Sequence, residues 1–188
     1  QLHDPSRQRL FVITHHRRVP LHRPRLAQHP TCLPLAHAQL LPDVLDRDTP
    51  ILLAVAMMRP GDKLASYRAL AEALGHVADE RWQLVIAGDG PARAGVASAF
   101  AHFRPGRIRF AGQRTSGDLA RIYAAADLQV WPAINEAFGI ALLEAQAAGV
   151  PVVAGDVGGV GDIVRHGESG VLVGANDPEA FAIAVRTL

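Results

Sequence analysis

From Ile51 onward the chain alternates between short apolar runs and longer amphipathic segments, and this alternation restricts its fold more than any other feature. Apolar runs of this length, bounded by polar or glycine-rich turns, are typical of buried strands. We expect strands at 51–57, 82–87, 108–111, 128–131, 151–154 and 170–173.

The segments between these runs carry helical periodicity, the first of them in Leu64, Tyr67, Leu70 and Leu74. We expect helices at 62–77, 91–103, 116–125 (capped by Thr115 or Ser116), 138–148, 160–165, and from Asp177 onward. This order predicts an α/β fold, a Rossmann-like parallel sheet with helices on both faces. Such sheets bind ligands at the carboxyl ends of their strands, so we expect function in the loops that follow the strands.

Residues 1–50 differ in composition, with six of the nine histidines and seven of the thirteen prolines. Only Leu10–Ile13 has the character of a strand, and the prolines oppose helices and central strands. We interpret this segment as a linker or remnant of a preceding domain, with disorder or an incorrectly translated reading frame as open alternatives. The histidine spacing favours a solvated segment over a metal site, and we attribute the D-x-D triplet at 46–48 to chance.

Composition narrows the function classes. With 49% hydrophobic and 20% charged residues the chain is typical of a globular domain, and a net charge of +1 gives no argument for nucleic-acid binding. A single cysteine, Cys32, excludes an internal disulfide framework and is compatible with a reducing, cytoplasmic location. No apolar run reaches the roughly 18 residues of a membrane span, and no signal peptide is recognisable. The domain at 51–188 ends in a helix that stops mid-course, so we expect truncation at the carboxyl terminus.

The loop after the first strand carries two cations, Arg59 and Lys63, and Lys63 is the only lysine of the chain. A guanidinium and an ammonium beside a helix start suit a diphosphate, the first by bidentate contacts and the second as a point charge. The alternative is that both are solvated loop charges.

The loop after the second strand is Gly88-Asp89-Gly90, where glycine lets the backbone approach a ligand or make a tight turn. We include these three residues among the candidates for ligand binding, with a ligand-free turn as the alternative. The G-x-G-x-x-G dinucleotide fingerprint is missing.

The segment from Trp131 to Ala145 carries the strongest signal. A strand ends, Glu136 follows in a loop, and the backbone amides of Phe138, Gly139 and Ile140 open a helix as an anion site. Glu136 is placed to accept hydrogen bonds from sugar hydroxyls, and Glu144, in an otherwise apolar stretch, from a ribose diol. The alternatives are a helix-start charge for Glu136, and an exposed residue or structural ion pair for Glu144.

Several ordered motifs in residues 51–188 resemble the large retaining glycosyltransferase family 4, which has the GT-B fold. Glu136 and Glu144 look like its E-x7-E pair, and Tyr123–Leu128 resembles its Y-x-x-A-D-hydrophobe signature. The stretch 157–164 resembles its glycine-glycine loop, and 166–173 its N-G-x-x-G-hydrophobe stretch. The chain departs from the family pattern at Ala133, Ala137 and Asp162 and in an Arg59–Lys63 spacing one residue shorter than is common.

By this resemblance, Arg59 and Lys63 would bind the donor diphosphate, Glu136 the transferred sugar, Glu144 the ribose and the Phe138–Ile140 amides the distal phosphate. The chain would be the donor-binding, C-terminal half of a hexosyltransferase that needs no metal or other cofactor. Its partners would be a nucleotide sugar and a glycan, lipid or small-molecule acceptor. The amino-terminal domain, mostly missing here, would supply the acceptor groove and any peripheral association with the inner membrane face, so the isolated fragment is expected to be inactive.

Two other readings stay open. The chain could be a module that binds a nucleotide sugar without transferring it, or a GT-B-like epimerase or phosphorylase. A phosphorylase needs a cofactor lysine in this half, and Lys63 is the sole candidate.

Overall fold

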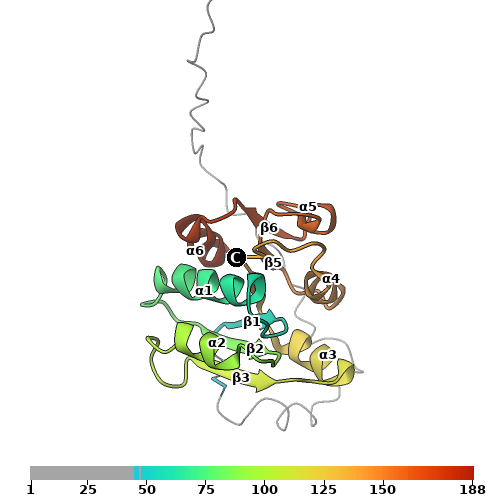
Figure 1. The fold of residues 1–188 in the computed structure, drawn as a ribbon. Coiled ribbons are helices and arrows are strands. Elements are labelled where there is room, and N and C mark those ends of the chain that lie inside the picture. Colours follow the sequence, from blue (N-terminus) through green and yellow to red (C-terminus); the bar gives the residue numbers. More distant parts are fainter. Residues whose placement is uncertain (1–44, 47) are drawn as a thin grey trace, which may run out of the picture.

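Six parallel strands form one twisted sheet in the order β3-β2-β1-β4-β5-β6 (Figure 1). The computed structural model describes residues 45, 46 and 48–188. The strands are β1 (Ile51–Val55), β2 (Gln83–Ala87), β3 (Ile108–Gly112), β4 (Leu128–Trp131), β5 (Val152–Gly155) and β6 (Gly170–Val173). The four inner strands of this order, β2, β1, β4 and β5, are almost wholly buried, as their largely apolar composition requires.

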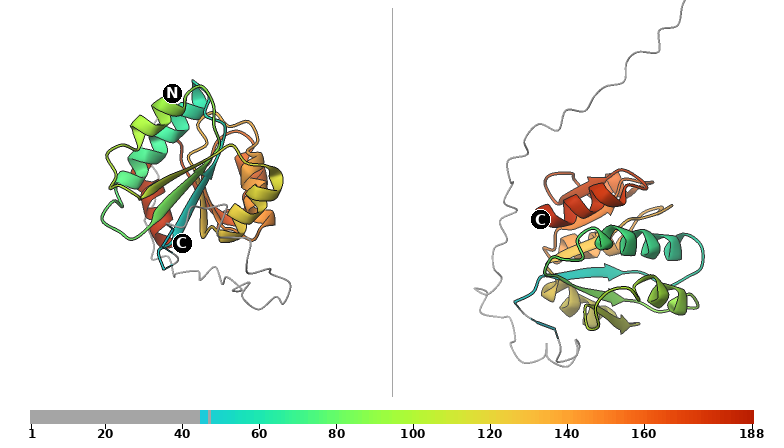
Figure 2. Two further views of the ribbon diagram at one scale, coloured as in Figure 1. Left: turned by 90° about the horizontal axis from the view of Figure 1, so that it is seen from below. Right: turned by 90° about the vertical axis from the view of Figure 1, so that its left-hand side faces the viewer.

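Helices connect the strands and cover both faces of the sheet. They are α1 (Asp62–Gly75), α2 (Arg93–Ala99), α3 (Ser116–Ala125), α4 (Ile140–Ala147), α5 (Val160–Ile163) and α6 (Pro178–Thr187). Figure 2 shows α1, α2 and α6 on one face and α3 and α4 on the other. The predicted α/β class, with a parallel sheet and helices on both faces, is confirmed.

The strand order places a topological switch between β1 and β4. The chain builds outward from β1 through β2 to β3, then returns to lay β4 beside β1, with Leu53 opposite Gln129. The connections that follow β1 and β4 lead to opposite faces of the sheet, and folds of this kind bind ligands at the carboxyl edge beside such a switch point. The fold therefore directs attention to the loops that follow these two strands.

All twelve elements predicted from residue 51 onward are present, although several boundaries differ by one to four residues. Strand β1 ends at Val55 rather than at residue 57, and α2 covers only Arg93–Ala99 of the predicted 91–103. Helix α4 begins at Ile140 instead of residue 138, because Gly139 adopts a left-handed conformation (φ 82°) that cannot continue into the helix from Phe138. The predicted cap of α3 is Thr115, whose hydroxyl accepts a hydrogen bond from the Asp118 amide.

The predictions for residues 1–50 fall almost entirely outside the described residues, including Leu10–Ile13 and the histidine-rich stretch. Asp46 is described, and it closes a turn by accepting hydrogen bonds from the Thr49 hydroxyl (2.6 Å) and the Asp48 amide (3.0 Å). Within residues 45, 46 and 48–188, no three histidine, cysteine or acidic side chains cluster as metal ligands, and no helix is long and apolar enough to cross a bilayer.

Candidate functional site

The loop after β4 (residues 132–139) is fastened to the first turns of α1. The Ile134 amide donates to the Ser66 hydroxyl (3.0 Å), and the Asn135 side chain donates to Asp62 (2.8 Å). Ala133 and Asn135 both have positive φ, a conformation that non-glycine residues rarely adopt and that the surrounding contacts must stabilise. These contacts bring the segments after β1 and β4 together at the switch point.

Lys63 and Glu136 meet there. The Lys63 ammonium, in the first turn of α1, donates to Glu136 Oε2, and both side chains are largely buried, with 21% and 15% of their surfaces exposed. The same carboxylate oxygen accepts a hydrogen bond from the indole N–H of Trp131 (3.2 Å). The ammonium also lies 5.4 Å from the centre of the Trp131 ring, within cation–π range. Two of the predicted site residues are thus in direct contact, although they come from different loops.

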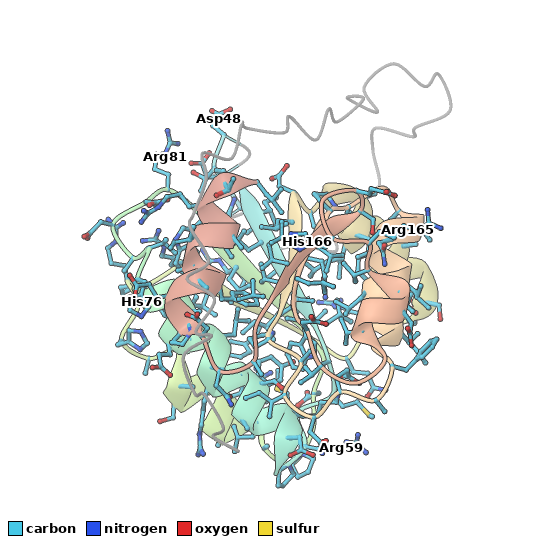
Figure 3. All side chains as sticks on the ribbon, turned by 90° about the horizontal axis from the view of Figure 1, so that it is seen from above. Asp48, Arg59, His76, Arg81, Arg165 and His166 are labelled. Carbon is cyan, nitrogen blue, oxygen red and sulfur yellow. The ribbon has the colours of Figure 1, made fainter. Side chains whose placement is uncertain are left out.

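Arg59 lies four residues before Lys63, in the loop that leads into α1. Its side chain is exposed and extends away from the body of the protein beside the start of α1 (Figure 3). Figure 3 also shows Asp48 and Arg81 at the opposite end of the molecule, by the amino ends of the strands. Among the described residues Arg59 forms no ion pair, so its guanidinium is available to a ligand at the carboxyl edge.

Gly88, Asp89 and Gly90 brace the loop after β1. The Met58 amide donates to the Asp89 carbonyl (2.9 Å), and the Ala92 amide to the Met58 carbonyl (2.8 Å). A Cβ on Gly88 would overlap the Ala56 carbonyl oxygen, and both glycines have positive φ. Packing against the neighbouring loop therefore requires both glycines whether or not a ligand binds here.

The start of α4 directly follows the loop after β4 that carries Glu136. Gly139 is its N-cap, and the first amides of a helix have no partner within the helix, so they remain available to an anion. Phe138, predicted to open the helix, instead precedes the cap, and its side chain is half exposed, as is that of Ile140. Of the three predicted amides, those of Gly139 and Ile140 belong to the helix start.

The loop that follows β5 packs against the backbone of Glu136 and Ala137. The Gly159 amide donates to the Ala137 carbonyl (3.2 Å), and a Cβ on Gly158 would overlap the carbonyl oxygen of Glu136. The sequence indicated Gly158 and Gly159 only through their resemblance to a family motif. The structure shows why glycine is needed there, since a Cβ at either position would overlap a backbone carbonyl oxygen of the Glu136 loop.

Glu144 is exposed on α4 rather than buried among its apolar neighbours. The phenol of Tyr123, on α3, donates to Glu144 Oε2 (3.0 Å) at an apolar groove between the two helices. Burial, reinforced by the negative charge of Glu144, raises the pKa of the Tyr123 phenol above its ordinary value. Tyr123 therefore stays protonated and fixes one carboxylate oxygen, which leaves the other free to accept.

Sequence reasoning missed four residues that build this site. They are Ser66, Tyr123 as a partner of Glu144, Trp131 and Asn135. Trp131 was readable only as a strand residue, and Tyr123 only as a helix residue and as the first position of the signature at 123–128. A hydrogen bond between segments that lie far apart in the chain leaves no periodic signal. The left-handed Asn135 could have been suspected from its position in a loop, where asparagine tolerates positive φ.

This parallel sheet with helices on both faces is shared with GT-B glycosyltransferases of known structure. The chain belongs to the family described as glycosyl transferases group 1, whose model matches residues 49–188. That match begins close to the predicted domain boundary before Ile51.

Curated relatives carry the name D-inositol 3-phosphate glycosyltransferase. The Corynebacterium glutamicum (strain R) protein is 46% identical over 82 residues, which are 44% of this chain and 20% of that protein. The second such enzyme of Catenulispora acidiphila is 38% identical over 155 residues, covering 77% of this chain and 36% of that one. The chain thus spans well under half the length of these relatives.

Solved structures show the same fold. Sucrose-phosphate synthase from Thermosynechococcus elongatus is 32% identical and superposes with a TM-score of 0.62, over 76% of this chain and 36% of that one. Anabaena HepE in complex with UDP-glucose is 24% identical, with a TM-score of 0.65 over 74% of this chain and 39% of that one.

Proposed function

We propose that this chain is the donor half of a retaining glycosyltransferase of the family 4 type, and that it binds a nucleoside diphosphate sugar at the carboxyl edge between β1 and β4. The observation that carries this proposal is the contact between Lys63 and Glu136 at the switch point. The diphosphate and the sugar are adjacent in a nucleoside diphosphate sugar. The cation assigned to the diphosphate, Lys63, and the carboxylate assigned to the sugar, Glu136, are adjacent in the same way.

The other candidate residues extend the same assignment. Arg59, exposed at the rim, supplies a second cation to the diphosphate. The Gly139 and Ile140 amides at the start of α4, with the Phe138 amide just before them, meet the distal phosphate, and Glu144 meets the ribose. Gly88, Asp89 and Gly90 shape the wall on the β2 side.

Transfer breaks the bond between the anomeric carbon and the diphosphate oxygen. Negative charge grows on the departing phosphate, and Lys63, Arg59 and the helix amides stabilise it without a metal ion. The acceptor hydroxyl attacks the anomeric carbon from the same face, which gives retention of configuration, and passes its proton to the departing diphosphate oxygen. Glu136 is assigned to hold the sugar rather than to form a covalent intermediate.

The acceptor side lies with the half of the enzyme that this chain does not span. The curated relatives are named for D-inositol 3-phosphate, which makes a phosphorylated cyclitol the first acceptor to assay. Glycans, lipids and other small molecules are the remaining classes.

Calorimetry of the chain against UDP, GDP and ADP tests donor binding directly, and circular dichroism beforehand establishes that the sample is folded. We expect one base to be preferred at micromolar affinity. A folded sample that binds none of the three diphosphates would refute the proposal. A labelled nucleotide sugar, assayed with and without an intact amino-terminal half, then separates transfer from binding alone and from epimerisation or phosphorolysis.

A further inference from the structure

Trp131, the last residue of β4, contacts both charged groups of the site. Its indole N–H donates to Glu136 Oε2 (3.2 Å), and its ring faces the Lys63 ammonium at 5.4 Å. One side chain therefore contacts both the carboxylate assigned to the sugar and the cation assigned to the diphosphate.

The indole is held rigidly. Trp131 is 3% exposed and belongs to a strand with neighbours on both sides, pairing with Ala154 of β5. The ring of Tyr67 meets it edge to face, at 5.1 Å between centroids and 79° between planes. Tyr67 is itself fully buried, and its hydroxyl donates to the Ala56 carbonyl (2.8 Å). Trp131 thus cannot follow a movement of either charged partner.

A bound diphosphate competes for Lys63. The ammonium has three protons to donate, and the oxygens of a diphosphate draw it away from Glu136. Once Lys63 turns to phosphate, Glu136 loses its counter-charge, and the fixed indole N–H is the remaining side-chain donor that contacts it within the described residues. The largely buried carboxylate then keeps its orientation through the Trp131 N–H.

We propose that Trp131 is a positioning residue that holds Glu136 toward the sugar after Lys63 has turned to the diphosphate, and that it thereby sets the preference for the nucleotide sugar over the free nucleoside diphosphate. This proposal rests on the donor-binding function proposed above. It predicts an effect on discrimination between two ligands, which a residue that only fills the core would not have.

The test is the pair of affinities for UDP-glucose and UDP in Trp131→Phe, which keeps an aromatic ring and removes the N–H. Where the calorimetry above identifies guanine or adenine, the matching glucose-bearing pair replaces them. We expect UDP-glucose to bind about tenfold more weakly, as loss of one hydrogen bond to a charged group implies, and UDP to bind within about twofold of wild type.

The chain offers a matched control in its other tryptophan. Trp82 is 5% exposed, its N–H donates to the Val77 carbonyl (2.7 Å), and its ring meets Phe103 edge to face. It precedes β2, at the amino edge of the sheet. Trp82→Phe therefore loses a comparable buried hydrogen bond away from the site, and it should leave the affinity ratio unchanged.

Each outcome decides between the two proposals. A wild-type chain that binds no nucleotide removes the proposed function and this inference with it. If the wild-type chain binds nucleotides but Trp131→Phe leaves the ratio of the UDP-glucose and UDP affinities unchanged, only the inference is overturned. This holds whether both affinities stay at the wild-type value or fall equally.

A second measurement does not depend on the folding of Trp131→Phe. In the Trp82→Phe background Trp131 is the only tryptophan. At saturating concentrations, UDP-glucose should then change its fluorescence emission differently from UDP, and Glu136→Gln should remove that difference. An emission that does not distinguish the two ligands, or a difference that persists in Glu136→Gln, would overturn the positioning role.

Discussion

Lys63 and Glu136 stand 73 residues apart in the sequence and share an ion pair at the carboxyl edge of the sheet. The pair exists because β4 returns to lie beside β1, so the helix after one strand faces the loop after the other. In the structure each group satisfies the other, and under the proposed function a nucleotide-sugar donor would separate them. This competition gives two predictions of opposite sign.

Lys63→Ala should weaken binding of the nucleoside diphosphate about 10- to 100-fold, because it removes a charge-assisted contact of about 1.5–3 kcal/mol. Calorimetry measures the change. Arg68→Ala is the matched control, since it removes one positive charge from an exposed position on the same helix. Equal affinity in Lys63→Ala and wild type would remove Lys63 from the diphosphate site.

Glu136→Gln should have the reverse effect on the free diphosphate. Without the carboxylate, Lys63 has no charged competitor, and we expect UDP, or the diphosphate of the preferred base, to bind a few-fold more tightly. The nucleotide sugar should bind more weakly, since the amide accepts fewer hydrogen bonds from the sugar hydroxyls. Isothermal titration of both ligands gives the two signs, and a loss for both would contradict the competition.

Replacing Gln129 with an apolar residue should stabilise the protein. It lies in the middle of β4 with no exposed surface, and neither its amide nitrogen nor its oxygen has a hydrogen-bond partner within the described residues. A buried polar group without a partner costs about 1–3 kcal/mol, so Gln129→Met, which is similar in volume, should raise the free energy of unfolding by about that amount. Chemical denaturation followed by circular dichroism measures the difference.

Gln83 supplies the control for that substitution. It is also buried in a strand, but its amide donates to the carbonyls of Asp46 and Thr49. Gln83→Met should therefore lower stability, while Gln129→Met raises it. A loss in both variants would mean that a buried water satisfies Gln129.

The sequence predicted the sheet and its helices because burial on both faces and helical amphipathicity leave periodic patterns in the chain. It also placed Glu136 and Lys63 after their strands. The strand order, which lays β4 beside β1, then brings the two side chains together. What it could not predict were contacts such as Trp131 to Glu136 or Tyr123 to Glu144. Apolar neighbours around Glu144 suggested burial, whereas Leu143 beside it is itself 38% exposed. The two-residue error at α4 has a similar origin, since only the backbone conformation of Gly139 decides where that helix begins.

The two tyrosines of the chain predict how stability depends on pH. Burial raises the pKa of both Tyr67 and Tyr123 above the value of about 10 that a free phenol has. The unfolded state therefore loses these protons first. The two buried, protonated phenols therefore stabilise the folded state fully below about pH 10. This contribution is lost as the pH rises above that value, because only the unfolded state releases the protons readily.

A spectrophotometric titration checks this. We expect no phenolate absorbance near pH 10 while the far-ultraviolet circular dichroism is native, and a joint rise of phenolate and loss of ellipticity at higher pH. Tyr123→Phe assigns the remaining signal to Tyr67. Phenolate formed near pH 10 in a folded protein would contradict the burial of that tyrosine.

Gly158 links the loop after β5 to the position of Glu136. It has a positive φ of 56°, and a Cβ there would overlap the carbonyl oxygen of Glu136. Gly158→Ala must therefore both adopt a left-handed conformation and displace the backbone that carries the carboxylate. We expect a loss of about 2–4 kcal/mol in stability, from about 1–2 for the conformation and the rest from overpacking.

Gly167→Ala separates these two causes. Gly167 has a positive φ of 81° as well, but a Cβ there has no neighbour within 4 Å. It should lose about 1–2 kcal/mol and keep wild-type affinity for the nucleotide sugar, because only the conformational strain applies. Gly158→Ala should also lose affinity for the nucleotide sugar in calorimetry at a temperature where both variants are folded. If the two variants bound it equally well, the backbone of Glu136 would not depend on the loop after β5.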